Sequence, residues 1–255
     1  MLFKEFDARM RVYETAHDQC VLPGVYMVAR LDGRCFTRLT KVQRFERPFD
    51  VDFRDHMVAV ACHLMRCGFN ATYAYIQSDE ISLLFDLAEN TFGRKLRKLN
   101  SVLAGEASAK FTKCLGGGDM GVFDCRISQL PRTGDVVDYF RWRQEDAYRN
   151  ALHGHCYWML RGDGRSASEA TSLLSGSSSS DKQELLFSNG TNFNGIPLWH
   201  KRGTGIYWET YKKKAANPVT GDKVDVERRR IRVDFELPIH DEYALFVRRL
   251  IGVLT

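Results

Sequence analysis

The chain has 255 residues, of which 44% are hydrophobic and 27% are charged, and its formal net charge is +5. This length and composition predict one large globular domain or two small ones, and they exclude the disordered and fibrous classes. The modest basic excess is compatible with a polyanionic partner such as a nucleic acid but does not establish one.

Targeting and redox features are sparse. The chain contains no run of about 18 apolar residues, and acids stand near the N-terminus where a signal peptide would have its apolar region. We therefore expect a soluble, cytoplasmic protein with no membrane partner. The seven cysteines include no Cys-x-x-Cys pair, which argues against a disulfide framework and a zinc ribbon.

Hydrophobic spacing predicts alternating strands and helices in the first half of the chain. Apolar residues spaced three and four apart in residues 3–17 predict an amphipathic helix, which we expect to lie against the body of the protein. Apolar patterns and the turn residues between them predict the remaining elements. In chain order these are a strand over 25–31, a helix over 53–67, strands over 72–76 and 81–87, a helix over 90–113 and a strand over 122–127.

The order strand, helix, strand, strand, helix, strand is that of the ferredoxin-like βαββαβ unit. The first two strands are joined by a helix and must run parallel with a right-handed crossover, and the third strand returns antiparallel between them. The end of the first strand therefore lies beside the start of the third. We expect Asp32 from the first strand to meet Asp79 and Glu80 at one edge of the sheet.

Acids at two adjacent strand ends are candidates for a metal site. Mg²⁺ prefers carboxylate and backbone oxygens, and two such ions about 4 Å apart polarise the attacking and leaving oxygens of phosphoryl transfer. Asp32 and Asp79 could bridge two ions, with the carbonyl of Gly33 as a further ligand and Glu80 as an auxiliary acid. The alternative is that both sites are only turns, because Asp caps its own backbone and Gly accepts positive φ.

The second half of the chain has more irregular elements. A helix is expected over 135–152, followed by a loose, mobile Gly- and Ser-rich segment over 161–180. Capping boxes that begin at Ser166 and Ser180 predict two short helices there. The chain is completed by strands over 204–211 and 231–237, turn residues around 217–222 between them, and a helix over 239–250.

Basic residues gather at several places along the chain. The connection over 33–48 is either a solvated loop or a set of cations beside the acidic strand end. The predicted helix over 90–113 has a basic first half at 94–98. Two more clusters, at 212–214 and 228–230, belong to the last two strands and either keep that pair soluble or contact phosphates.

Six short motifs resemble, in the same order, those of the tRNA-His guanylyltransferase superfamily. The resemblance runs from about residue 3 to about residue 240, and several ordered motifs are more specific than any one of them. The chain looks most similar to the Thg1-like proteins, the 3′-5′ RNA polymerases of bacteria and archaea. The motifs are 30–36 (RLDGRCF), 77–80 (QSDE), 123–126 (FDCR), 142–144 (WRQ), 192–194 (NFN) and 200–204 (HKRGT).

The resemblance implies an α+β fold with a palm of the polymerase and cyclase type. Such a palm is a ferredoxin-like βαββαβ antiparallel sheet with added helices and, here, a C-terminal strand pair. The catalytic palm domain would span residues 1–134, and a C-terminal region over 135–255 would pack on it.

The implied activity adds nucleotides to the 5′ end of tRNA in the 3′-to-5′ direction. The 5′ end is first activated, by adenylylation of a monophosphate or by an existing triphosphate, and the 3′-hydroxyl of an incoming nucleotide then attacks it. The implied partners are tRNA, ATP, GTP and other nucleoside triphosphates, two Mg²⁺ ions, and further copies of the chain in a homotetramer.

The resemblance also implies roles for single residues. Asp32 and Asp79 are the catalytic acids that hold two Mg²⁺ ions with the carbonyl of Gly33, and Glu80 is the third catalytic and metal-binding acid. Arg47 stands where the family commonly has a Lys before Pro, and Arg keeps the charge without the point-like geometry. The implied nucleotide-binding residues are Gly33, Arg34, Cys35, Phe36, Arg47, Ser78, Lys182 and Asn192, of which the last two serve activation or transfer.

One motif departs from the family pattern. Eukaryotic members have His-Ile-Asn-Asn, a run associated with reading the tRNA-His anticodon, where this chain has Tyr-Arg-Asn-Ala at 148–151. The departure favours templated repair of 5′-truncated tRNA over non-templated addition of the extra 5′ guanosine to tRNA-His. A palm-type nucleotidyl cyclase and a tRNA-binding protein with vestigial acids stay open as alternatives.

Overall fold

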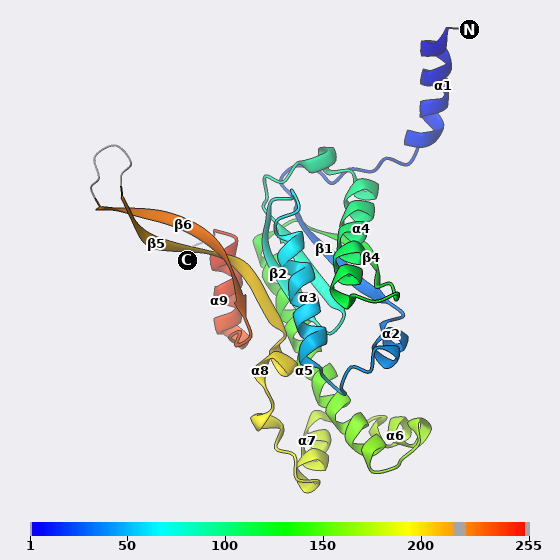
Figure 1. Ribbon diagram of the computed structural model, residues 1–255, viewed down its shortest axis with the longest axis vertical. Coiled ribbons are helices and arrows are strands. Elements are labelled where there is room, and N and C mark those ends of the chain that lie inside the picture. The colour runs from blue at the N-terminus through cyan, green and yellow to red at the C-terminus, as the bar shows by residue number, and fades with distance from the viewer. Residues whose placement is uncertain (1, 217–222, 253–255) are drawn as a thin grey trace.

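A computed structural model describes residues 2–216 and 223–252. Within them, one antiparallel sheet carries helices on both faces, and a two-stranded arm extends beyond its edge (Figure 1). No helix in these ranges is both long and apolar enough to cross a membrane. The turn residues expected around 217–222 lie outside the described residues.

The sheet has six strands in the order β4-β1-β3-β2-β5-β6, and every neighbouring pair is antiparallel. Strands β1 and β2 run parallel to each other because β3 is inserted between them, so the predicted βαββαβ order is confirmed. The strands are β1 (Tyr26–Arg34), β2 (Ala71–Gln77), β3 (Glu80–Phe85), β4 (Val122–Leu130), β5 (Thr204–Ala216) and β6 (Lys223–Asp234).

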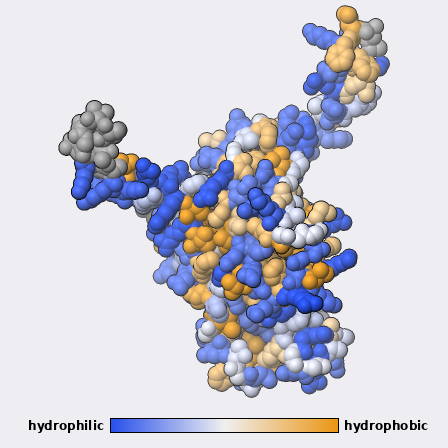
Figure 2. Space-filling model, viewed as in Figure 1, coloured by the Kyte–Doolittle hydropathy of each residue, from blue (hydrophilic) through white to orange (hydrophobic). Residues whose placement is uncertain are grey.

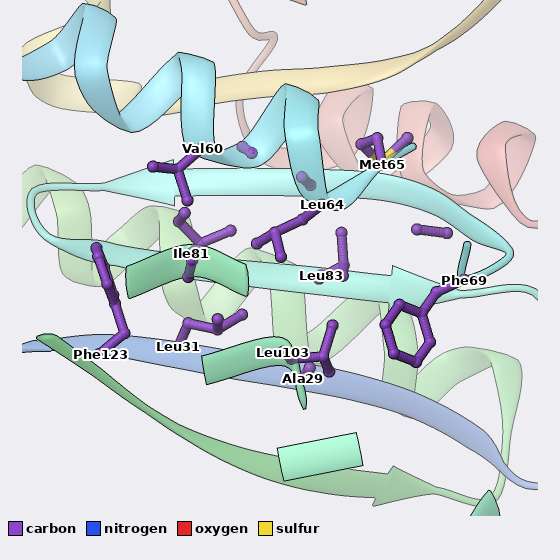
Figure 3. Close-up of a cluster of buried hydrophobic side chains, with 14 of the residues drawn as sticks. Ala29, Leu31, Val60, Leu64, Met65, Phe69, Ile81, Leu83, Leu103 and Phe123 are labelled. Atoms are coloured by element: carbon purple, nitrogen blue, oxygen red, sulfur yellow. The ribbon is translucent and has the colours of Figure 1, made fainter. Parts of the chain in front are cut away.

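Two helices cover one face of the sheet, α3 (Val51–Leu64) and α4 (Leu96–Leu115). Their apolar side chains pack on strand residues such as Leu31 and Ile81, as Figure 3 shows. Each fully buried Leu or Ile contributes roughly 1.5–3 kcal/mol through removal from water. The packing of these helices fixes the strand ends at which Asp32, Asp79 and Glu80 lie.

Two further helices cover the opposite face, α5 (Thr133–Gly162) and α9 (His240–Leu250). They pack on Val28 and Leu84, whose chain neighbours point to the first layer. With both faces buried, the central strands read as nearly continuous apolar runs.

The first helix, α1 (Phe3–Thr15), is present as predicted, but its expected packing on the protein body is wrong. It has no buried residue and projects from the end of the molecule (Figure 1), and Figure 2 shows its apolar side chains in solvent. Asp18, just beyond it, is bound by Lys95 and Arg97 at the start of α4. These ion pairs fix the segment after α1 to the edge of the core. Other helices already cover both faces of the sheet, and α1 packs on neither face.

The connection after β1 contains a helix, α2 (Phe36–Val42), where the sequence predicted only a loop or a cluster of cations. Phe36 anchors it, because this ring is 3% exposed and packs against Phe111 and Phe123. A side chain at Gly33 would meet the Phe36 ring at 2.6 Å, so the close approach requires glycine.

The predicted helix over 90–113 begins later, at Leu96, after a short 3-10 turn η1 (Thr91–Arg94). Phe92 and Gly93 both have positive φ in this turn and break the helical run. Arg94 is 4% exposed and donates to backbone carbonyls, among them that of Glu89 at 2.9 Å. Arg94, the first residue of the basic cluster at 94–98, is therefore held inside the protein and is not part of a solvent-facing basic surface.

Helix α5 continues to Gly162, well beyond the expected end, and supports α6 (Ala167–Leu174) and α7 (Ser179–Ser188). The capping box at Ser166 is confirmed, whereas the second box begins at Ser178 with Asp181 as its acid. Leu174 and Leu186 are buried against α5, so the segment expected to be mobile is packed. Two short elements, η2 (Phe193–Gly195) and α8 (Leu198–Arg202), lead back to the sheet.

The arm is longer than the predicted strands. β5 pairs with β2 only from Thr204 to Tyr207, and the rest of β5 pairs with β6 alone. Figure 2 shows hydrophilic residues along this arm, which includes the basic clusters at 212–214 and 228–230. The arm therefore presents its cations to solvent rather than to the core.

Candidate active site

The acids of β1 and β3 lie side by side at one end of the sheet. Asp32 pairs directly with Glu80 on β3 and, on its other side, with Asp124 on β4. The N–H of Gly33 donates to the carbonyl of Asp79 over 3.2 Å and ties the end of β1 to the β2–β3 turn. The predicted meeting of these acids is confirmed, and Asp124 is an acid that the strand-order prediction had not included.

Asp79 occupies the tight turn between β2 and β3. Ser78 beside it has a φ of 52°, the left-handed conformation typical of a two-residue hairpin turn. Burial, with a smaller contribution from the nearby charge of Asp32, raises the pKa of Asp79 to about 6. A buried carboxylate that is costly to ionise gains from a nearby cation, so Asp79 suits a metal-binding position.

Glu80 is held between two guanidinium groups. Arg30 donates to one carboxylate oxygen, and Nη2 of Arg143 lies 3.3 Å from the other. Arg143 comes from α5, is 3% exposed and also donates to Asp146. Two cations thus balance two acids beneath the turn, and Glu80 anchors the hairpin next to Asp32.

The ion-pair cluster formed by Glu80, Arg30, Arg143 and Asp146 extends to the wall of a neighbouring pocket. Asp146 accepts from Nη2 of Arg149 over 3.0 Å and from Nδ2 of Asn150 over 3.3 Å. Gln77 lies between Asp146 and Arg143, and both Gln77 and Asn150 line the pocket. The sequence motif around Arg143 was visible, but its ion pair with Asp146 was missed, although the two residues stand three apart on one helix, a spacing typical of such pairs.

A pocket of about 230 Å³ opens beside Asp79. Four of the predicted residues line it, namely Phe36, Arg47, Ser78 and Asp79. Residues that sequence reasoning missed complete the walls, among them Thr37, Thr40, Gln77, Trp158, Trp199 and His200. The structure therefore joins the acidic strand ends to a cavity lined by two arginines and several aromatic rings.

The other predicted residues lie at different distances from this pocket. Arg34 and Cys35 are exposed between β1 and α2, and Cys35 has a φ of 61° at the N-terminus of α2. Lys182 lies on α7, where its carbonyl accepts from Sγ of Cys156. Asn192 lines a separate hollow together with Gln183. Lys182 and Asn192 are thus not brought to the wall that Asp79 lines.

A stack of rings forms one wall of the pocket. Phe49 stacks against both His155 and His200, with ring centroids 5.6 Å and 4.2 Å away. Nε2 of His155 is 3.2 Å from Nδ1 of His200. Burial lowers the pKa of His200 to about 4, so this ring is neutral near pH 7 and serves as a rigid wall.

The two residues after His200 have structural partners. Lys201 is 8% exposed and donates to the carbonyls of Phe193 and Asn194 over 3.1 and 2.9 Å. Arg202 donates to the carbonyl of Leu237 over 2.9 Å. This motif therefore fixes the path of the chain around η2 and α8.

The donor set at the strand ends fits a divalent cation that arrives with a nucleotide. Mg²⁺ is usually held by one or two protein carboxylates together with substrate phosphates and water. Asp32 and Asp79 supply two carboxylates, and Asp79 is the group whose ionisation burial opposes. In the described ranges no three His, Cys, Asp or Glu side chains form a complete protein-only metal cage.

The fold and the site together define a class of protein. A ferredoxin-like sheet with paired acids at adjacent strand ends, beside a pocket that holds an arginine, is the arrangement of palm-type nucleotidyltransferases.

Comparison with known proteins agrees with this class. A family model described as tRNAHis guanylyltransferase matches residues 7–131, and one described as Thg1 C terminal domain matches residues 134–238. A relative from Drosophila melanogaster, named probable tRNA(His) guanylyltransferase, is 32% identical over 195 residues, which are 73% of this chain and 68% of the relative. A Bos taurus relative of the same name is 30% identical over 240 residues, which are 88% of this chain and 79% of the relative.

Solved structures that match this chain belong to the same family. A bacterial tRNA(His) guanylyltransferase (Thg1)-like protein in complex with ATP matches with a TM-score of 0.76 at 27% identity, covering 98% of this chain and 100% of that one. The tRNA(His) guanylyltransferase of Saccharomyces cerevisiae matches with a TM-score of 0.71 at 27% identity, covering 77% and 91%. The chain belongs to the tRNA(His) guanylyltransferase family of nucleotidyltransferases, and the resemblance read from its motifs is confirmed.

Proposed function

We propose that this protein adds nucleotides to the 5′ end of tRNA in the 3′-to-5′ direction and repairs 5′-truncated tRNA by templated addition. The observation that carries the proposal is the pairing of Asp32 with the β2–β3 turn that holds Asp79, beside a pocket lined by Arg47. Nucleotide transfer needs acids for a metal and a cation for phosphates at one place, and this site has both.

The proposed mechanism assigns a part to each side of the site. Asp32, Asp79 and the carbonyl of Gly33 would hold two Mg²⁺ ions, which polarise the attacking 3′-hydroxyl and stabilise the leaving oxygen. Arg47 and Ser78 would contact the nucleotide, and the exposed Arg34 and Cys35 would meet its phosphates with Phe36 beneath them. ATP or GTP would activate the 5′ end.

Glu80 keeps its proposed role as supporting acid. Its contacts with Arg30 and Arg143 favour a role in fixing the hairpin, so that Asp32 and Asp79 face the substrate in a set geometry. Lys182 and Asn192, on α7 and before η2, are proposed to act on the RNA end during activation or transfer rather than on the nucleotide in the pocket.

The run at 148–151 supports templated repair. Tyr148 accepts from Nε2 of Gln183 over 2.7 Å and packs edge-on against Phe193, and Arg149 pairs with Asp146. Asn150 and Ala151 line the pocket. Tyr148 and Ala151 are engaged within the protein, and the exposed Arg149 is tied to Asp146, so we propose that base pairing selects the added nucleotide.

Further properties are proposed on the same basis. We infer a cytoplasmic protein, because its proposed substrate is tRNA, with a palm over 1–134 and a C-terminal region over 135–255. We also infer a homotetramer, to which the exposed apolar side chains of α1 could contribute. Light scattering of the purified protein, with and without residues 1–16, tests the assembly.

An extension assay tests the proposed function. Purified protein, Mg²⁺, labelled nucleotides and a tRNA lacking its 5′ nucleotide should give a longer 5′ end, and Asp79→Ala should abolish the product. Asp138→Ala is the matched control, because Asp138 is an exposed acid on α5 away from the pocket.

The identity of the added base distinguishes templated repair from tRNA-His maturation. Addition that follows the opposing base supports repair, whereas guanosine added opposite adenosine identifies tRNA-His maturation. A cyclic nucleotide formed without RNA would identify a cyclase, and RNA binding without turnover would identify a binding protein. Full activity of Asp79→Ala would overturn the proposed metal site.

A further inference from the structure

The side chains around Arg47 hold its guanidinium in one orientation. Nη2 of Arg47 donates to Oγ1 of Thr40 over 2.6 Å and to the carbonyl of Thr37 over 3.4 Å. Cζ of Arg47 lies over the ring of Trp158, 5.3 Å from its centroid. Helix α2 therefore holds one nitrogen of the guanidinium, and helix α5 covers one of its faces.

Thr40 is itself fixed. It is 7% exposed, and its hydroxyl donates to the carbonyl of Phe36 over 2.7 Å. Because that bond uses the only hydroxyl proton, the oxygen is left to accept from Arg47. A Lys at position 47 could reach this oxygen but has no planar group to lie on the Trp158 ring.

Arg47, Thr40 and Trp158 all line the pocket that Asp79 borders. Within the described residues, Nε and Nη1 of Arg47 donate to no protein acceptor, so these donors remain for a ligand. Their placement next to the acids suits an anionic group that also carries a divalent cation, which is the chemistry of a nucleoside triphosphate.

We propose that Thr40 and Trp158 are positioning residues that aim the guanidinium of Arg47 at the triphosphate of the bound nucleotide. This inference rests on the proposed function of the pocket. An arginine side chain otherwise loses rotamer freedom when it binds a ligand, and two supports from separate helices remove that freedom beforehand. The pair of supports is matched to the planar guanidinium of arginine.

Calorimetric titration with GTP and with GMP, each with Mg²⁺, tests the inference. Thr40→Val should weaken GTP binding about 5- to 10-fold, as expected for loss of a charge-assisted hydrogen bond, and Trp158→Leu about 2- to 5-fold, as expected for loss of an exposed cation–π contact. GMP binding should stay within about twofold, because GMP lacks the outer phosphates. Arg47→Lys should weaken GTP binding about tenfold in the otherwise unchanged chain but at most about twofold in the Thr40→Val, Trp158→Leu background.

Two controls separate positioning from general structure. Trp158→Phe keeps an aromatic face and should retain GTP affinity within about twofold. Thr171→Val removes the same type of hydroxyl-to-carbonyl bond, 2.9 Å long on the exposed side of α6, and should change nothing. Thermal unfolding of each variant verifies that it is folded.

The outcomes distinguish this inference from the function on which it rests. If the unchanged chain fails to bind GTP, both the proposed function and the inference are overturned. If GTP binds but its affinity is insensitive to Thr40→Val and Trp158→Leu, the inference alone is overturned. An equal loss for GTP and GMP, or losses simply additive with Arg47→Lys, also overturns it, because the two residues would then shape the pocket and not the guanidinium.

Discussion

Charged side chains are buried at the β1–β3 end of the sheet and exposed on the β5–β6 arm of the same sheet. At the β1–β3 end, Glu80 and Arg143 meet in the interior, and the Arg143 side chain is 3% exposed. On the β5–β6 arm, Arg230 and Arg232 share Glu209, and these arginine side chains are 62% and 51% exposed. An exposed ion pair contributes about 0–1 kcal/mol, whereas removing one partner of a buried pair costs about 3–5 kcal/mol. The first region is therefore built to hold a geometry, and the second to present charge to a partner.

The largest effect is expected at the acid of the buried region. Asp79→Asn keeps the shape of the side chain but removes a charge on which a metal depends, so nucleotide addition should fall by roughly three orders of magnitude or more. Single-turnover extension of a 5′-truncated tRNA measures this loss. Asp138→Asn, on an exposed part of α5, should retain full activity, and a comparable loss there would contradict the assignment.

The second-largest effect is expected on the unfolding free energy, when an arginine is removed from the buried ion pair or from the exposed ion pair. Arg143→Met leaves Glu80 and Asp146 without a shared guanidinium and should lower the unfolding free energy by about 3–5 kcal/mol. Arg230→Met on the arm should change it by less than about 1 kcal/mol. Urea unfolding of both variants provides the measurement, and equal effects would remove the contrast drawn between the two regions.

The pH dependence of stability gives a smaller effect with a definite sign. The pKa of Asp79 is raised to about 6, so the folded protein is favoured when Asp79 is protonated, and this stability is lost as the pH rises from below 4 through 6. Asp79→Asn should therefore raise the unfolding free energy by about 2 kcal/mol at pH 7.5 and have little effect at pH 3.5. Unfolding curves at the two pH values check this, and a destabilised variant at pH 7.5 would contradict the buried placement.

The smallest effect is expected on the arm. Lys213→Ala and Arg228→Ala remove exposed cations, and each should weaken tRNA binding only a few fold and lower the salt slope of log K by about 1. GTP binding should not change, because the arm does not line the pocket. Filter binding over a range of salt concentrations measures both quantities, and an unchanged slope would show that the arm lies away from the RNA.

The predictable part of the site followed from local signals combined with a chirality rule. The apolar runs around Asp32 and Asp79, within the element order βαββαβ, predict the ferredoxin-like arrangement in which β3 lies between β1 and β2. That arrangement places Asp32 opposite Glu80, as observed. The order of the motifs supplied the family, which the comparisons confirm.

The unpredicted part depends on partners that are distant in sequence. Arg94 reads as a solvated helix residue, yet backbone carbonyls of two separate loops draw it into the interior. Phe3 and its neighbours read as a buried helix face, yet α1 has no buried residue in the structure. Trp158 lies beyond the expected end of the helix over 135–152, and only the full length of α5 brings it under Arg47.

The sequence by itself determined the order of the first four strands and the meeting of the acids, because these depend on hydrophobic period, turn chemistry and crossover hand. The order of its motifs indicated the family. Only the tertiary structure decided how the charges are used. Whether a cation is buried, paired or presented depends on which acceptors the packed helices bring near it, and on how far water is excluded there. Arg143, Arg94 and Arg47 have the same side chain, and their different surroundings make them an anchor of the hairpin, a clamp on backbone carbonyls and a proposed contact for phosphate.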